Sequence, residues 1–327
     1  MGIALQTMTN ELTHVFLLSV GAFLLAMFLT PIYTFFAYRY RFWKRQRSES
    51  TDGKKLKVFA KFQAAKLRRN IPTMAGVIGV ISIFVVTIFF NLDRAQTWLP
   101  LAALVGGGIV GLIDDIINLR GLGGGAAGLR SPVKFALITL IGVVLGWFFF
   151  AKLGVASFHV PFVGEVNIGW LIVPLFAFAV VATGNAVNIS DGMDGLAGGL
   201  LGISFGAFGV IALLQQHVIL AGFCFTVVGV LLSYLWFNIY PARFFMGDVG
   251  SFAYGACLGV VAMLTDSLLL LPVIGLLFVI EAGSSLTQIV SKKLFKRKIF
   301  LSAPIHHHLE AIGWPETKVT MRFWVIG

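Results

Sequence analysis

Continuous apolar runs, and not alternating apolar and polar positions, dominate the chain. Runs of about 20 residues are long enough to cross a bilayer as helices. They lie near residues 14–36, 73–91, 99–118, 133–151, 168–187, 195–214, 218–237, 251–269 and 271–290. A tenth run begins at Val319 and stops at Gly327, so we expect a truncated tenth helix. Continuous runs argue against a β-barrel, and the pattern predicts an all-α polytopic membrane protein with about ten transmembrane helices.

Composition supports this fold class. The chain is 58% hydrophobic and 12% charged, whereas a soluble domain carries about a quarter charged residues. Cys224 and Cys257 both lie inside apolar runs, so we interpret them as small buried residues and infer no disulfide. The first run lacks the features of a cleaved signal peptide and is interpreted as a retained anchor. We expect one integral membrane domain over residues 1–327.

The basic residues predict the orientation. Twelve of the 25 Lys and Arg residues lie in segment 37–72, and basic segments face the cytoplasm. Alternation of the spans then places segments 119–132, 188–194, 238–250 and 291–318 there too. Only Arg94 and Lys152 fall in external segments. The net charge of +11 is thus accounted for by topology and anionic headgroups, and we expect no nucleic-acid partner.

Acidic residues and a histidine run gather on this same predicted side. They are, in chain order, Asp114 and Asp115, Asp191 and Asp194, Asp248, and His306 to His308. Because the orientation rests on basic residues alone, their agreement is independent support. Acids at the ends of membrane helices are costly and usually functional. Carboxylates on one face indicate a divalent metal, and thereby phosphate chemistry.

Each acidic cluster also has a plainer interpretation. Asp114 and Asp115 repel each other unless a cation is near, but they could instead mark a helix end reaching water beside Arg120. Asp191 and Asp194 follow Asn188 at intervals of three. The three would share one face of a helix, or they could form an ordinary polar turn.

The remaining polar positions also allow a functional and a plainer interpretation. Asp248, in a glycine-bounded turn, could chelate a hard cation. Phe245 could stack on a base or sit at the membrane interface. The histidine run could bind zinc, but adjacent residues do not share a helix face, so phosphate contact or proton transfer is favoured over a solvated loop. Lys134 could snorkel or hold a phosphate, and Glu281 with Gln288 could simply join helices.

Together these motifs resemble a known family. They are segments 185–197, 245–251 and 304–308, then 313–315 and 322–324, with 72–74 and the Asp114–Asp115 pair. The resemblance is to the bacterial phospho-N-acetylmuramoyl-pentapeptide transferase family, in the polyprenyl-phosphate N-acetylhexosamine-1-phosphate transferase superfamily. It covers nearly the whole chain in order, and the histidine run followed by Gly313-Trp-Pro315 points to this branch.

The resemblance implies a ten-helix enzyme of the bacterial inner (plasma) membrane, commonly a homodimer, with Mg²⁺ and a cytoplasmic active site. Such an enzyme transfers phospho-MurNAc-pentapeptide from UDP-MurNAc-pentapeptide to undecaprenyl phosphate. The products are lipid I and UMP, in the first membrane step of peptidoglycan synthesis. Because the second pKa of a phosphate is about 6, we favour direct attack by the lipid phosphate over an aspartyl-phosphate intermediate.

Carried over by matching motif, the resemblance implies specific residue roles. The catalytic residues would be Asp114, Asp115, Asp191, Asp248 and His306. Asp248 would hold Mg²⁺, with Asp115 as a second candidate ligand, and Asp114 would be the base for the lipid phosphate. The substrate-binding residues would be Thr73, Lys134, Asn185, Asn188, Gly192, Asp194, Asn238, Phe245, Gln288, His307 and His308. Among these, Gly192 and Asp194 would lie near uracil, with Phe245 stacked on it.

Other functions remain open at this point. A relative that transfers GlcNAc-1-phosphate to the same lipid is one, although the histidine run followed by Gly313-Trp-Pro315 argues against it. A secondary transporter would also account for acids in helices, but its site would lie near the bilayer midplane. A catalytically inactive scaffold is the third. The family usually has Lys where this chain has Asn118, and Arg120 or Lys134 is the candidate to supply that charge.

Overall fold

A computed structural model of the chain describes residues 2–43, 70–121 and 128–327. Its helices are α1 (Gly2–Arg39), α3 (Gly76–Phe90), α4 (Trp98–Arg120), α5 (Ser131–Leu153), α6 (Ile172–Ser190), α7 (Leu196–Leu214), α8 (Val218–Asn238), α9 (Gly247–Leu264), α10 (Leu271–Ile274), α11 (Leu276–Phe295), α12 (Ile305–Ala311) and α13 (Glu316–Ile326). Most of the basic segment 37–72 and residues 122–127 of segment 119–132 lie outside the described residues.

The predicted apolar runs coincide with helices. Among the described residues, seven helices are long and apolar enough to cross a membrane: α1, α4, α5, α6, α7, α8 and α9. Helix α3 is apolar but has 15 residues. The prediction of one continuous ninth span is wrong, because α10 and α11 meet at an angle of 81°. Pro272 and Gly275 lie at this break, and helix kinks commonly occur at such residues.

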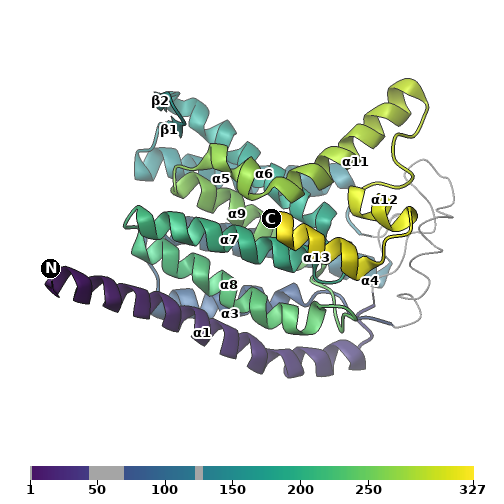
Figure 1. Cartoon of the computed structure of the whole chain (residues 1–327), viewed down its shortest axis with the longest axis horizontal. Helices are drawn as coiled ribbons and strands as arrows, with labels where there is room; N and C mark the ends of the chain where they lie inside the picture. The colour runs from purple at the N-terminus through teal and green to yellow at the C-terminus, as the bar shows by residue number, and fades with distance from the viewer. Residues whose placement is uncertain (1, 44–69, 122–127) are drawn as a thin grey trace.

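Helix α9 lies in the middle of the bundle (Figure 1) and packs against both α4 and α6. All of its residues except Leu264 are buried. A Cβ atom at Gly111 of α4 would lie 2.1 Å from the carbonyl oxygen of Asp248, so the two backbones meet only because this position has no side chain. This contact brings the end of α4 against the start of α9.

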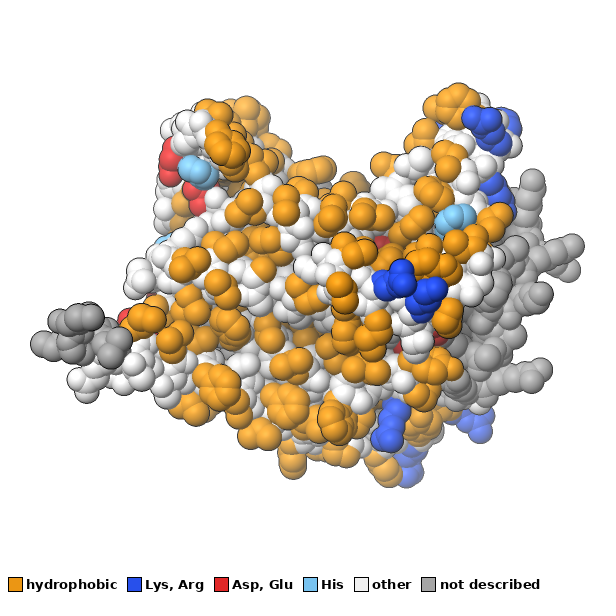
Figure 2. Space-filling model, in the orientation of Figure 1, with side chains coloured by type: hydrophobic (Ala, Val, Ile, Leu, Met, Phe, Trp, Pro, Cys, Tyr) orange, Lys and Arg blue, Asp and Glu red, His pale blue; other side chains and the backbone are white. Residues whose placement is uncertain are grey.

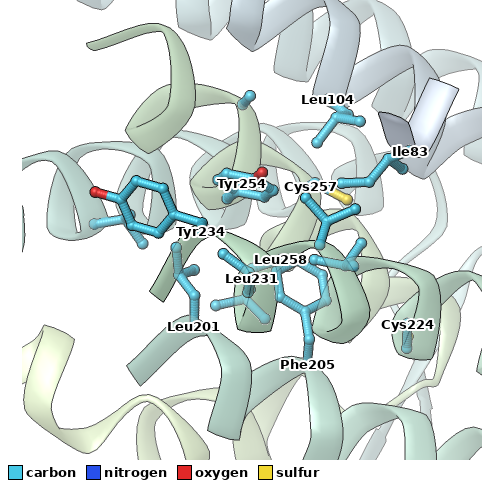
Figure 3. Packing of buried hydrophobic residues seen from close by; sticks show 14 of the residues in the cluster. Ile83, Leu104, Leu201, Phe205, Cys224, Leu231, Tyr234, Tyr254, Cys257 and Leu258 are labelled. Carbon is cyan, nitrogen blue, oxygen red and sulfur yellow. The ribbon is translucent and has the colours of Figure 1, made fainter. Parts of the chain in front are cut away.

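The apolar core surrounds α9 on its other side as well. Tyr254, Cys257 and Leu258 of α9 pack among side chains of α7 and α8, including Phe205 and Leu231 (Figure 3). Cys224 and Cys257 are both buried and free, as expected from their apolar surroundings. The packed core fixes the helix ends that carry the polar residues.

The surface has the character of a membrane protein. Large apolar side chains such as Phe28, Phe178 and Trp236 are exposed, and hydrophobic atoms cover much of the side of the bundle (Figure 2). Soluble monomers rarely expose apolar patches of more than a few hundred Å². On the face shown, Lys and Arg gather at the end where α12 and α13 begin, which fits the all-α polytopic membrane fold.

A short hairpin lies at the opposite end of the bundle (Figure 1). Strands β1 (Ser157–Val160) and β2 (Gly164–Asn167) pair antiparallel, and the 3-10 helices η1 (Gly169–Leu171) and η2 (Leu268–Leu270) lie nearby in the fold. The backbone N–H of His159 donates to Asp266 Oδ1 at 2.8 Å. The sequence pattern did not predict the hairpin, because four-residue strands leave too short an alternation.

At the end that carries the acids, three predicted boundaries are corrected. Helix α9 begins at Gly247, before the predicted start at 251, so Asp248 lies in its first turn, where the helix dipole favours an acid. Helix α6 continues to Ser190, into the predicted loop 188–194. Segment 291–318, expected as a loop, contains the short helix α12.

Candidate active site

Three carboxylates from two helices form the centre of the site. Asp114 and Asp115 lie in the last turns of α4, and Asp248 lies in the first turn of α9. Their side chains are buried, with residue exposures of 2%, 0% and 6%. Each offers an oxygen, and these oxygens lie within 4.8 Å of one another. We call Asp114, Asp115 and Asp248 the acidic triad.

Lys134 supplies a positive charge to the acidic triad. It lies in the first turn of α5, and its Nζ is 2.6 Å from Asp248 Oδ2 and 3.1 Å from Asp114 Oδ2. The ammonium also lies 5.2 Å from the ring centre of Phe252, a favourable cation–π distance. The sequence left Arg120 and Lys134 open as the source of this charge. In the described part of the chain, Lys134 is the one that pairs with Asp114 and Asp248.

Backbone N–H groups fix two carboxylates of the acidic triad. Leu129 N–H donates to Asp114 Oδ1 at 2.7 Å, and Val249 N–H donates to Asp115 Oδ2 at 3.1 Å. Charge-assisted bonds of this kind hold a carboxylate in one orientation. The three carboxylates place oxygens within 4.8 Å of one another, and the oxygen ligands of one hard cation lie about 2–2.6 Å from it. The donor set and spacing therefore fit a single divalent cation.

A turn after α6 carries the second acidic motif. A shared helix face for Asn188, Asp191 and Asp194 would require the helix to continue through Asp194. Helix α6 ends at Ser190, so the three residues do not share one. The Asn188 side chain donates to Ser251 Oγ of α9 at 2.9 Å, which links the turn to the helix of Asp248. Asn185 instead donates to the carbonyl of Val181, one turn back in its own helix, at 2.8 Å.

The histidine run forms part of helix α12 and divides into two groups. The rings of His306 and His307 are 4.1 Å apart between centroids. A Cβ atom at Gly192 would lie 2.6 Å from His306 Nε2 and 3.5 Å from His307 Nε2, so both imidazoles reach the turn after α6. His308 lies apart, because its Nδ1 accepts the N–H of Leu301 at 3.3 Å.

Thr73 and Phe245 come together through backbone pairing. Phe245 N–H donates to the carbonyl of Pro72 at 2.8 Å, and Ala75 N–H donates to the carbonyl of Phe245 at 3.0 Å. The carbonyl of Thr73 accepts the hydroxyl of Tyr33. Phe245 is half-buried, so part of its ring is accessible, as stacking on a base would require.

Asp194 and Asn238 hold the turn after α6 in place. Asp194 Oδ2 accepts the N–H of Ala242 at 3.0 Å. Asn238 accepts the N–H of Gly195 and donates to the carbonyl of Phe244, both at 2.9 Å. These bonds tie the turn to the segment before α9.

Helix α13 closes over the same turn. Glu316 accepts the N–H of Asp194 at 2.7 Å, Thr320 donates to the Asp194 carbonyl at 3.1 Å, and Trp324 donates to the Gly195 carbonyl at 3.1 Å. Polar side chains in the last helix are the one sequence feature that hints at these contacts.

Gln288 lies farther along α11, and it binds the backbone at both ends of its amide. Its Oε1 accepts the N–H groups of Ile299 and Phe300 at 3.0 Å, and its Nε2 donates to the Phe300 carbonyl at 2.9 Å. The predicted substrate contact of Gln288 remains a prediction.

Two glutamates were not predicted as site residues: Glu281, which bonds to His306, and Glu310, which bonds to His307. A buried acid in an apolar run and a His-x-x-Glu spacing are the signals that could have indicated them.

Comparison with known proteins identifies the class. The model of a family described as Glycosyl transferase family 4 matches residues 97–266, the stretch from α4 to α9 that carries the whole acidic triad. The chain therefore belongs to glycosyl transferase family 4. Relatives that are 35–38% identical place it within this family among the phospho-N-acetylmuramoyl-pentapeptide-transferases.

Three relatives support the narrower assignment, and each is a phospho-N-acetylmuramoyl-pentapeptide-transferase. The one from Chloroflexus aggregans is 38% identical over 100% of this chain and 90% of its own length. The one from Geobacillus thermodenitrificans is 36% identical over 94% and 92%, and the one from Oceanobacillus iheyensis is 35% identical over 97% and 95%. The resemblance inferred from the motifs is confirmed, and the chain is an enzyme of the phosphotransferase class.

Proposed function

We propose that the chain transfers phospho-MurNAc-pentapeptide from UDP-MurNAc-pentapeptide to undecaprenyl phosphate, giving lipid I and UMP. The observation that carries the proposal is the buried acidic triad, facing the same end of the bundle as the histidines of α12. The relatives are named for the transfer of phospho-N-acetylmuramoyl-pentapeptide. The basic residues at this end support a cytoplasmic active site in the bacterial plasma membrane.

The acidic triad is suited to hold Mg²⁺. Asp248 and Asp115 are our candidate ligands, and the observed cluster of three buried carboxylates matches the oxygen ligands that Mg²⁺ takes. When bound, such an ion neutralises charge on a diphosphate and on the departing nucleotide. The protein's own task is then to position the two substrates, which is most of what phosphoryl transfer requires.

Asp114 and Lys134 are assigned to the acceptor. Asp114 would orient the lipid phosphate or take its remaining proton, and its fixed oxygen supports that role, since Leu129 N–H holds Oδ1. An ammonium has three donors, and the two contacts of Lys134 with Asp114 and Asp248 leave one for a substrate oxygen. In this way one side chain would connect the acids with the attacking phosphate.

The turn after α6 and the pair Thr73–Phe245 are assigned to the donor. Gly192, which follows Asp191 in the chain, lies beside the histidines, and the half-buried ring of Phe245 is available for the uracil. The bonds of Asp194 and Asn238 show how this turn keeps its shape.

Because residues from α1 to α13 meet at one end, we propose a single transferase domain over 1–327. The homodimer implied by the family belongs to the same proposal, and the mass of the detergent-solubilised protein would test it.

Donor and acceptor requirements test the function. The purified chain should release UMP from UDP-MurNAc-pentapeptide only when undecaprenyl phosphate is present, and it should release little from UDP-GlcNAc. Preference for UDP-GlcNAc would assign the other branch of the superfamily. Labelled UMP should not exchange into the donor without lipid, since direct attack needs the acceptor. Exchange without lipid would instead establish a covalent enzyme intermediate.

A further inference from the structure

Each of the two histidines that reach the turn after α6 has its own carboxylate. His306 Nδ1 lies 2.8 Å from Glu281 Oε2, and His307 Nδ1 lies 2.7 Å from Glu310 Oε2. A glutamate that is ionised can only accept a hydrogen bond, so pairing with an ionised glutamate requires the hydrogen on Nδ1 of the ring. The same nitrogen is therefore engaged in both rings.

This pairing determines what the opposite nitrogen can do. With Nδ1–H held by a carboxylate, Nε2 is the lone-pair nitrogen of the neutral ring and a second donor of the charged ring. Both Nε2 atoms lie against Gly192, where a Cβ atom would come within 2.6 Å of His306 Nε2 and 3.5 Å of His307 Nε2. Two imidazoles thus present equivalent nitrogens to the backbone beside Asp191.

The two pairs differ in burial. The side chains of Glu281 and His306 are both 0% exposed, while those of His307 and Glu310 are 12% and 17% exposed. Glu281 belongs to α11, and a carboxylate buried in an apolar helix is costly unless it is paired. One turn further along α11, Ser284 Oγ accepts the N–H of Ile305 at 2.9 Å. Helix α11 beyond its break thus holds the start of α12 at two points.

We propose that Glu281 and Glu310 are positioning residues, which fix His306 and His307 with Nε2 directed at the turn after α6, where the two imidazoles bind an oxyanion of the diphosphate donor. The identity of that oxyanion rests on the proposed function. Both glutamates act through an imidazole, and Glu281 has the larger effect because its pair is shielded from water. The pairing itself is independent of the reaction.

A spectroscopic experiment tests the pairing without any turnover. The chain contains six histidines, and ¹⁵N-histidine labelling in nanodiscs, with the variant His306→Gln for assignment, isolates the His306 signals. Wild type and Glu281→Gln should show hydrogen on Nδ1, because Gln keeps an acceptor at that point. Glu281→Leu should lose this signature. An unchanged His306 spectrum in Glu281→Leu would overturn the proposal.

Kinetics test the consequence. Loss of a carboxylate that orients a metal-bound histidine typically costs about 10–100-fold in affinity or activity, and we expect a fall of that order in kcat for Glu281→Leu, with most of it recovered in Glu281→Gln. In a His306→Gln background, Glu281→Leu should add little. If the kcat losses of Glu281→Leu and His306→Gln multiply in the double variant, Glu281 does not act through His306. Ser291→Ala, which removes only a bond from α11 to the carbonyl of Arg297, is the matched control and should retain wild-type kcat.

The two experiments separate the pairing from the reaction. If the wild-type chain releases no UMP from UDP-MurNAc-pentapeptide, the proposed function fails, while the ¹⁵N spectra still decide whether Glu281 positions His306. If UMP is released and the spectra do not respond to Glu281→Leu, the function stands and the positioning role is refuted. The same comparison applies to Glu310→Gln and Glu310→Leu with His307.

Discussion

Lys134→Met should reveal whether Lys134 is the internal counter-ion of the acidic triad. Its Nζ lies 2.6 Å and 3.1 Å from carboxylate oxygens of Asp248 and Asp114, and its side chain is 18% exposed. Unit charges 4 Å apart attract by about 4 kcal/mol at an effective dielectric constant of about 20. Removing one member of a buried ion pair costs about 3–5 kcal/mol. Methionine keeps most of the side-chain volume and removes the charge together with its N–H donors.

Two consequences should appear together. Without divalent cations, Lys134→Met should unfold at a clearly lower temperature than wild type, because three buried carboxylates lose their ammonium. Its affinity for Mn²⁺ should be at least tenfold higher, or about 1.4 kcal/mol, because a cation no longer competes for the oxygens of Asp114 and Asp248. Added metal should then restore much of the lost stability, since a ligand that binds only the folded state stabilises it.

The assay is Mn²⁺ binding followed by electron paramagnetic resonance, with thermal unfolding measured in EDTA and in Mn²⁺. Lys152→Met is the matched control, because Lys152 lies in the last turn of the same helix α5, at the opposite end and exposed. It should change neither quantity. Equal Mn²⁺ affinities for Lys134→Met and wild type would refute the counter-ion role.

Three further substitutions probe the geometry of the site. Gly192→Ala should displace the His306 imidazole, because Nε2 lies 2.6 Å from the new Cβ, and it should lower kcat at least tenfold in a UMP-release assay. Gly283→Ala is the control and should leave kcat unchanged, because its new Cβ would meet no neighbouring group of the described residues within 4 Å. Gly111→Ala would force a Cβ within 2.1 Å of the α9 backbone, so expression of folded protein, followed by size-exclusion chromatography, should fall sharply. Glu316→Ala removes an acceptor from a buried N–H and should cost about 1–3 kcal/mol, seen as a lower unfolding temperature; an unchanged temperature would show that α13 does not hold the turn.

The sequence predicted those parts of the fold that depend on local pattern. Apolar runs predicted the long helices, and alternation of the spans predicted that the ends of α4 and α9 that carry acids lie on one side. The break at Gly275 was missed because the interpretation followed the length of the apolar run, although Pro272 and Gly275 are residues at which helices commonly kink. The early start of α9 was missed for a similar reason, since a first turn containing Asp248 looks polar until its contact with Gly111 is known.

Sequence reasoning named the residues of the candidate site but not the contacts between them. Asp114, Asp115 and Asp248 were expected near one another because the orientation placed them on one side. Their pairing with Lys134 depends on how α5 packs, and the pairing of Glu281 with His306 joins residues 25 positions apart across a bent helix. Such partners are set by tertiary packing, so the sequence could only mark Glu281 as an unusual acid in an apolar run.

The most direct test of the account is product formation by the purified chain as Mg²⁺ is titrated. Wild type, Asp248→Asn and Asp266→Asn should be compared, with the lipid product identified by mass spectrometry. Asp266 lies at the hairpin end, where it accepts the N–H of His159, and is the matched acid-to-amide control. We predict Mg²⁺-dependent lipid I from wild type and Asp266→Asn, and at least a hundredfold less from Asp248→Asn. Undiminished lipid I from Asp248→Asn, or formation in the presence of excess EDTA, would contradict the assignment of the acidic triad as the metal centre of this transferase.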